Sequence, residues 1–130
     1  MKQLPIEFKT RMKNLLGDEY ALYEKAVNEP PQKAFRVNTN KISIEQFEKI
    51  NPFGNEKIPY VQNGYYLDFD KVGNHPFHHA GIIYVQEPAA MAPAECVDFA
   101  PDSYVLDMCA APGGKSTQLR NKLNDNGILV

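Results

Sequence analysis

The sequence lacks the features that define several classes of protein. It has two cysteines in 130 residues, Cys96 and Cys109, so no disulfide framework is expected and a reducing cytoplasm is favoured. No apolar run approaches the roughly 18 residues of a membrane span. The first residues, MKQLPIEFKT, contain no apolar segment of the kind found in signal peptides. We therefore expect a cytoplasmic protein without a membrane-spanning segment.

Charge of either sign is not in large excess, since the formal net charge is −2. This value excludes a strongly basic nucleic-acid-binding tail but leaves room for a local basic patch. Hydrophobic residues make up 43% and charged residues 23% of the chain, which is typical of a globular protein. Basic residues outnumber acidic ones over 1–50, and the reverse holds over 51–130. This difference indicates two regions with different roles.

The first region, 1–75, has the pattern of a small α+β domain. Apolar residues recur at helical spacing over 4–16, and Asp18 precedes a second helical stretch that Pro30-Pro31 ends. Alternation over 35–38 predicts a strand with Phe35 and Val37 directed inward.

Two further signals in this region are local. Ser43 and Gln46 have the spacing of a capping box and predict the start of a helix. Asn63-Gly64 lies between apolar and aromatic residues and predicts the turn of a hairpin within 58–69, because both residues tolerate positive φ.

The second region, 76–130, has the alternating pattern of an α/β domain. A strand, a loop rich in small residues, a helix and a second strand form the first βαβ unit of a parallel sheet. Because such a sheet needs further strands, we expect the sequence to stop within this domain. The predicted fold class is therefore α/β: a small α+β domain, then the beginning of a Rossmann-like sheet. The expected elements are strand 82–85, helix 87–99 kinked or split at Pro93, buried strand 104–108, loop 109–114, helix 115–124 and strand 128–130.

The segment 107–116 has the composition of a ligand-binding loop between a strand and a helix. Small residues let the backbone approach a ligand, and N–H groups at the start of the helix point toward it. Pro112 restrains the loop because proline fixes φ. The nucleoside-binding pattern D-x-G-x-G-x-G has its counterparts at Asp107, Cys109, Ala111 and Gly113.

Two other interpretations of the loop remain open. The phosphate-binding P-loop, G-x-x-x-x-G-K-[ST], matches at Gly114-Lys115-Ser116, but its first glycine falls on Cys109, and Pro112 removes an N–H donor. The alternative is an ordinary turn without a ligand. A run of small residues and proline before a lysine is unusual for such a turn.

Residues 106–119 are LDMCAAPGGKSTQL, residues 79–91 are HAGIIYVQEPAAM, and residues 35–39 are FRVNT. Residues 106–119 resemble the S-adenosylmethionine motif of the Nol/Nop/Sun family of RNA 5-methylcytosine methyltransferases. Residues 79–91 resemble the element before that motif, and residues 35–39 resemble the Arg-x-Asn strand of the same family. Their order and spacing are similar to those of a bacterial ribosomal-RNA member.

The resemblance implies a Rossmann-like methyltransferase domain preceded by a small RNA-contacting domain, with a boundary near residue 75. It implies methylation of cytosine C5 in RNA, with ribosomal RNA as the expected substrate, and S-adenosylmethionine as the cofactor. It also implies that the two catalytic cysteines lie beyond Val130, so we expect no catalytic residue here and no methylation by this chain alone. The residues implied to line the cofactor are Cys109, Ala110, Ala111, Pro112, Gly113, Gly114 and Lys115.

Arg36, Asn38 and Lys41 are the candidate RNA-binding residues, because Arg36 and Asn38 share a strand face and phosphates attract cations. A non-catalytic RNA-binding module is therefore an alternative function. We expect Cys96 in the core. We expect no metal site, since the histidines at 75, 78 and 79 lack a Cys-x-x-Cys partner.

Overall fold

The structure is a computed structural model that describes residues 4–68 and 71–130. It divides into two compact units, Met1–Pro31 and Gln32–Val130. The predicted boundary near residue 75 falls inside the second unit, and the assignment of separate RNA-contacting and methyltransferase domains stays a prediction. Within the described residues, no helix has both the length and the apolar character needed to cross a membrane.

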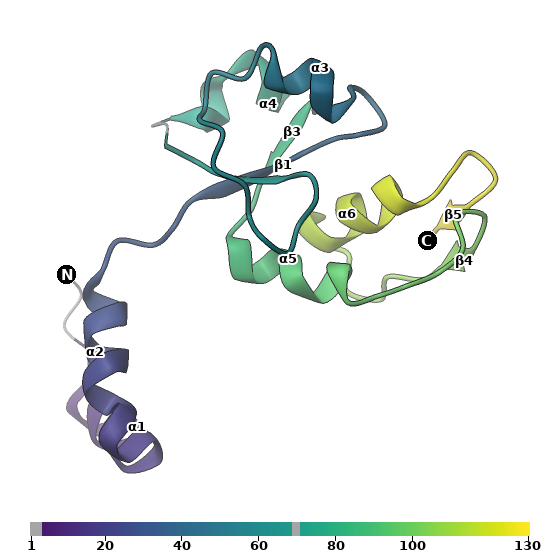
Figure 1. The fold of residues 1–130 in the computed structure, drawn as a ribbon. Helices are drawn as coiled ribbons and strands as arrows, with labels where there is room; N and C mark the ends of the chain where they lie inside the picture. The colour runs from purple at the N-terminus through teal and green to yellow at the C-terminus, as the bar shows by residue number, and fades with distance from the viewer. Residues whose placement is uncertain (1–3, 69–70) are drawn as a thin grey trace. The chain divides into compact units, whose positions relative to one another are not determined.

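The first unit is a pair of helices joined by a 3-10 turn, as the helical spacing predicted (Figure 1). The first helix follows Pro5 and ends at Gly17, whose φ of +52° lies in the left-handed region that favours glycine. Neither helix has a buried residue, so the pair has no core of its own. The elements are α1 (Ile6–Leu16), η1 (Gly17–Glu19) and α2 (Tyr20–Asn28).

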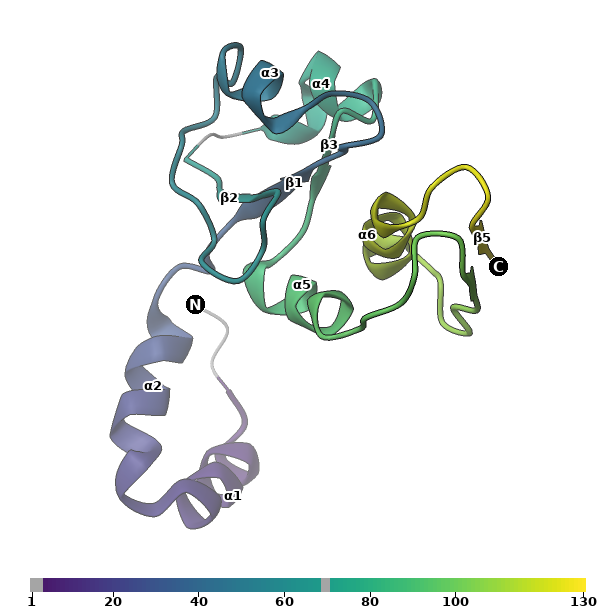
Figure 2. The ribbon, with the colours of Figure 1, turned by 45° about the vertical axis from the view of Figure 1, so that its right-hand side comes forward.

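The second unit is built on a three-stranded antiparallel sheet with the order β2-β1-β3 (Figure 2). The central strand β1 pairs with both neighbours, and Phe35 faces Tyr65 on one side and Val85 on the other. The predicted strand over 35–38 is thus confirmed as the middle of the sheet. The three strands are β1 (Ala34–Val37), β2 (Gly64–Tyr66) and β3 (Ile83–Val85).

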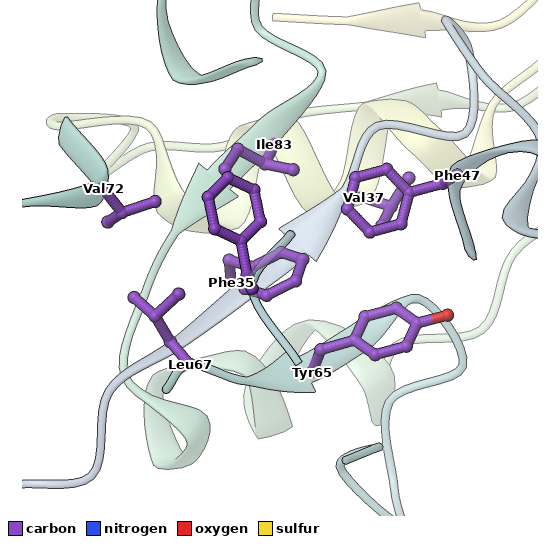
Figure 3. Close-up of a cluster of buried hydrophobic side chains, with 8 residues drawn as sticks. Phe35, Val37, Phe47, Tyr65, Leu67, Val72 and Ile83 are labelled. Carbon is purple, nitrogen blue, oxygen red and sulfur yellow. The ribbon is translucent and has the colours of Figure 1, made fainter. Parts of the chain in front are cut away.

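One face of this sheet forms the main hydrophobic core (Figure 3). Phe35 and Val37 are fully buried there, as the alternation predicted, and Phe35 stacks on Tyr65 with ring centroids 5.5 Å apart. Two short helices beside this core are α3 (Ile44–Glu48) and α4 (Pro76–His79), and the 3-10 turn η2 (Val72–Asn74) precedes α4. The capping box at the start of α3 is confirmed, because Ser43 and Gln46 exchange hydrogen bonds.

The opposite face of the sheet is also covered. Helices α5 (Pro88–Glu95) and α6 (Gly114–Lys122) pack on each other and lie on the other side of the sheet from α3 and α4 in both ribbon views (Figures 1 and 2). Met91 of α5 is buried with Ala34 of β1. Both faces of β1 are therefore inside the protein.

The remaining two strands, β4 (Tyr104–Val105) and β5 (Ile128–Leu129), are parallel neighbours connected through α6. The predicted strand, loop, helix and strand are thus confirmed, and the α/β class with them. The expectation of a buried strand over 104–108 was wrong: Tyr104 is 81% and Met108 85% exposed. In the described part of the chain, β4 pairs with β5 alone.

Three local predictions need correction. The hairpin turn does not lie at Asn63-Gly64, because Gly64 begins β2 and the chain reverses over 58–63. Helix α5 continues through Pro93 without being split, but it ends at Glu95 and not at the predicted residue 99. Cys96 directly follows this helix end and is exposed rather than in the core.

Candidate functional site

The candidate cofactor loop connects β4 to α6, and the Asp107 carboxylate holds both of its ends. Its Oδ1 accepts a hydrogen bond from the Cys109 backbone N–H (3.0 Å), and its Oδ2 accepts one from Ser116 Oγ (2.8 Å). Bonds to an ionised carboxylate are among the stronger hydrogen bonds of proteins. One acidic side chain at the end of a strand therefore fixes the loop against the first turn of α6.

Two consecutive glycines form the junction of loop and helix, each for a different reason. Gly113 has a φ of +106°, a conformation that side chains rarely allow. Gly114 lies against Gln86, and a Cβ added to it would be 3.1 Å from the Gln86 amide nitrogen. The small residues are thus required by backbone conformation and by close packing.

The loop is accessible from solvent along most of its length. Cys109 has a free thiol and is exposed, as are Ala110, Ala111, Pro112 and Lys115, whereas the two glycines are half-buried. The residues predicted to line a cofactor therefore form one continuous surface at the start of α6. Whether they bind a cofactor stays a prediction.

The Arg36 side chain is buried, whereas the sequence predicted an exposed one. Arg36 was predicted to face RNA from an open strand face, but its side chain is only 1% exposed because α5 and α6 cover that face. Its Nε donates to Gln86 Oε1 (3.0 Å), and its Nη2 donates to the Gly114 carbonyl (2.7 Å) and to Thr117 Oγ1 (2.9 Å). Arg36 thus joins the antiparallel sheet to the first turn of α6.

Two more residues from the end of β3 support the loop and were missed by the sequence analysis. Tyr84 donates its hydroxyl to the Pro112 carbonyl (3.3 Å), and its ring lies 5.4 Å from the Arg36 guanidinium carbon. Gln86 accepts from Arg36 and donates to the Ala90 carbonyl (2.8 Å). Alternation alone places Tyr84 on one strand face, but only the observed pairing of β1 with β3 brings it beside Arg36.

The charge of Arg36 is not neutralised by a carboxylate. Among the described residues it forms no ion pair, and its three acceptors are neutral. Burial lowers the pKa of Arg36 from its usual 12.5 to about 10, and Tyr84 and Glu95 oppose that change only in part. The protein therefore holds a buried cation without a direct ion pair, among the described residues, next to the candidate cofactor loop.

A small pocket lies beside this cation and brings the three predicted RNA-binding residues together. Its volume is about 150 Å³, and Arg36, Asn38, Lys41 and Tyr84 line it with residues of α6. Asn38 donates to the Gly81 carbonyl (3.0 Å), and Lys41 Nζ donates to the Ala80 carbonyl (2.6 Å). These contacts fix both side chains at the pocket wall.

Helix α6 is held on α5 by polar contacts behind the loop. Gln118 is 2% exposed and donates to the Met91 carbonyl (3.0 Å) and to Glu95 Oε1 (2.6 Å). Lys122 Nζ donates to the Ala94 carbonyl (2.7 Å). Both ends of α6 are therefore anchored, the first turn by Arg36 and the later turns by α5.

The histidines do not form a metal site. In residues 4–68 and 71–130, no group of three or more potential ligands is close enough to hold a metal ion. His75 packs its ring against Phe53 and Phe77, and its Nδ1 accepts the Phe77 N–H (3.1 Å). It caps α4 instead.

The fold and the loop together define a structural class. A strand-end carboxylate, a glycine-dependent loop, a helix and a parallel strand form a Rossmann-like α/β unit, and here an antiparallel sheet supports the loop. Comparison with known proteins identifies the family. A family model described as the N-terminal domain of 16S rRNA methyltransferase RsmF matches residues 4–88. The chain belongs to this family, which confirms the resemblance to RNA methyltransferases of the Nol/Nop/Sun type.

Two curated relatives and one solved structure are similar to most of this chain. The chain is 34% identical to "Ribosomal RNA small subunit methyltransferase F" of Pectobacterium atrosepticum and 36% identical to the protein of the same name from Vibrio cholerae, in each case over 98% of this chain and 29% of the relative. A crystal structure of a methyltransferase homologue from Pyrococcus horikoshii matches 97% of this chain and 43% of its own, with 30% identity and a TM-score of 0.81. The chain thus spans less than a third of the length of these curated relatives.

Proposed function

We propose that this chain supplies the cofactor loop and part of the RNA-contacting surface of an S-adenosylmethionine-dependent ribosomal RNA methyltransferase that acts on cytosine C5 in the cytoplasm. The loop of residues 109–115 is the observation that supports it most directly. It is exposed, it begins a helix, and it depends on glycine at the point of closest packing. The names of the two curated relatives, both ribosomal RNA methyltransferases, support the substrate class.

The residues present fit S-adenosylmethionine as the ligand. The methionine carboxylate of the cofactor requires N–H donors and positive charge, which a helix N-terminus and Lys115 offer. The glycines at 113 and 114 keep side chains away from the backbone that a ligand must approach. When bound, the cofactor supplies an electrophilic methyl group. The contribution of the loop is to bind and orient that cofactor.

The same geometry argues against a P-loop nucleotidase. In a P-loop, the residue at the position of Ser116 places its hydroxyl on a magnesium ion. Here Ser116 Oγ donates to Asp107 Oδ2, and the Cys109 N–H is bound by the same carboxylate. Two of the groups that a phosphate or its metal would need are therefore already used by an anion.

Calorimetric titration of the chain with S-adenosylmethionine and, separately, with ATP tests this proposal. We expect heat of binding for S-adenosylmethionine that the variant Gly114→Val abolishes, because a side chain there meets Gln86. Gly73→Val is the matched control, since an added Cβ at Gly73 meets nothing within 4 Å. Binding of ATP but not of S-adenosylmethionine would refute the proposal.

The catalytic step is proposed to depend on cysteines that follow this chain. Cys109 belongs to the cofactor loop, and Cys96 follows the end of α5. Incubation of the chain with ribosomal RNA and methyl-labelled cofactor should therefore transfer no label. Label transfer that Cys109→Ala or Cys96→Ala removes would contradict this assignment.

A further inference from the structure

The pocket beside the cofactor loop has the chemistry of an anion site. It lies where β1, β3 and α6 meet, and its volume is about 150 Å³. None of the residues that line it is acidic. The groups relevant to a ligand are the guanidinium of Arg36, the ammonium of Lys41 and the side-chain amides of Asn38 and Asn121.

Arg36 has unused capacity for hydrogen bonding in this pocket. Its Nε and Nη2 are engaged with Gln86, Gly114 and Thr117. Its Nη1 has no hydrogen-bond partner among the described residues. A guanidinium that is 1% exposed and has no carboxylate partner carries a cost of burial that an anion would offset.

Lys41 offers a second cation on the side open to solvent. Its Nζ donates one hydrogen bond, to the Ala80 carbonyl at 2.6 Å, and an ammonium group has three donors. The residue is exposed, so a ligand reaches it before it reaches Arg36. Arg36 offers the remaining N–H groups of its Nη1 and Lys41 offers a point charge, and both side chains are common ligands of phosphate in proteins.

We propose that this pocket binds one phosphate group of the RNA strand, with Arg36 Nη1 and Lys41 Nζ as its ligands. The inference rests on the proposed function for the choice of RNA, because a free inorganic anion has the same chemistry. The proposed phosphate subsite takes the place of the open basic strand face that the sequence predicted. It lies next to the first turn of α6, where the cofactor loop ends.

Fluorescence anisotropy with a short single-stranded RNA tests the subsite in the whole chain. Lys41→Ala should weaken binding about tenfold at low salt and reduce the slope of log K against log salt by about 0.7, the value for one phosphate contact on a single strand. The control is Lys49→Ala, which removes another exposed lysine, one that does not line the pocket. Equal effects of the two variants, or no RNA binding by the unaltered chain, would overturn the proposal.

The Nε–Hε resonance of Arg36 reports on the pocket without any change to Arg36, whose replacement risks unfolding the chain. We expect RNA to shift this resonance in the unaltered chain and in Lys49→Ala, and to shift it little in Lys41→Ala. An equal shift with the same concentration of inorganic phosphate would overturn the assignment to RNA. RNA binding that leaves this resonance unshifted would overturn the assignment of the pocket as the phosphate site. If S-adenosylmethionine still binds in calorimetry, the proposed function stands in that case.

Discussion

Arg36→Met tests whether Arg36 holds the cofactor loop in place. Methionine keeps an unbranched apolar stem and removes the charge and all three hydrogen bonds to Gln86, Gly114 and Thr117. We expect the second unit to lose stability and the first turn of α6 to loosen. The prediction distinguishes a residue that organises the loop from one that is merely buried beside it.

The magnitude follows from two opposing contributions. Each hydrogen bond from a charged donor contributes roughly 1.5–3 kcal/mol, so three of them contribute about 5–9 kcal/mol. Burial opposes this: it lowers the pKa of Arg36 to about 10, which corresponds to a cost of about 3 kcal/mol for the charged form. The net loss in Arg36→Met should therefore be about 4 kcal/mol, with a range of roughly 2–6 kcal/mol.

Amide hydrogen exchange is the suitable assay, because the chain has two compact units and exchange can be followed in one of them. The informative amides are those of Thr117, bonded to the Gly113 carbonyl, and Gln86, bonded to the Ala34 carbonyl. Lys49→Met is the control and should change their free energy of opening by less than about 0.5 kcal/mol. A change no larger than this in Arg36→Met would refute the argument.

Three further predictions concern the loop, a packed glycine and a surface carboxylate. Ser116→Ala should weaken S-adenosylmethionine binding about fivefold in calorimetry, because a hydrogen bond to a carboxylate is worth roughly 1 kcal/mol or more, and an unchanged Kd would contradict the role of Asp107. Gly127→Ala should cost about 1–3 kcal/mol in urea unfolding, since its Cβ would be 2.6 Å from the Pro101 carbonyl; a neutral result would mean that the backbone moves freely there. Hydrogen bonds from Lys57 and, to a smaller extent, Tyr65 lower the pKa of Glu48, so its stabilising effect is present above the ordinary glutamate pKa and is lost as pH falls through the lowered value. The difference in urea midpoint between the unaltered chain and Glu48→Gln should therefore shrink as the pH falls through that range, and a difference that persists under acid would contradict this sign.

Local signals in the sequence predicted the local structure well. Ser43 and Gln46 form their capping box because such a box involves only four consecutive residues and their own backbone. The alternation that directs Phe35 and Val37 into the core is likewise a property of one strand. The loop after Asp107 was recognisable from its small residues, and one of them, Gly113, is required by the loop's own backbone, since its φ is positive.

Features that depend on contacts between distant segments were not predictable. Alternation correctly separated Arg36 from the core face, but it does not say what covers the other face. Here that face is covered by α6, some 80 residues later, so a residue expected at the surface is 1% exposed. Tyr104 shows the reverse error: its strand is apolar, as in a buried parallel sheet, yet in the described residues it has one neighbour and is 81% exposed.

Arg36 also connects the two proposed binding sites physically. Its Nη2 holds Gly114 and Thr117 at the start of α6, and its side chain lines the pocket proposed for an RNA phosphate. Arg36 is charged at neutral pH, since its pKa is about 10, so the coupling acts through position: an anion that holds Nη1 also holds Nη2 against the Gly114 carbonyl. Occupation of the pocket should therefore favour the ordered cofactor loop, and by linkage an ordered loop should favour phosphate binding to the same extent. Burial of Arg36 beside neutral partners alone is costly. Its use by both the cofactor loop and the phosphate pocket offsets that cost.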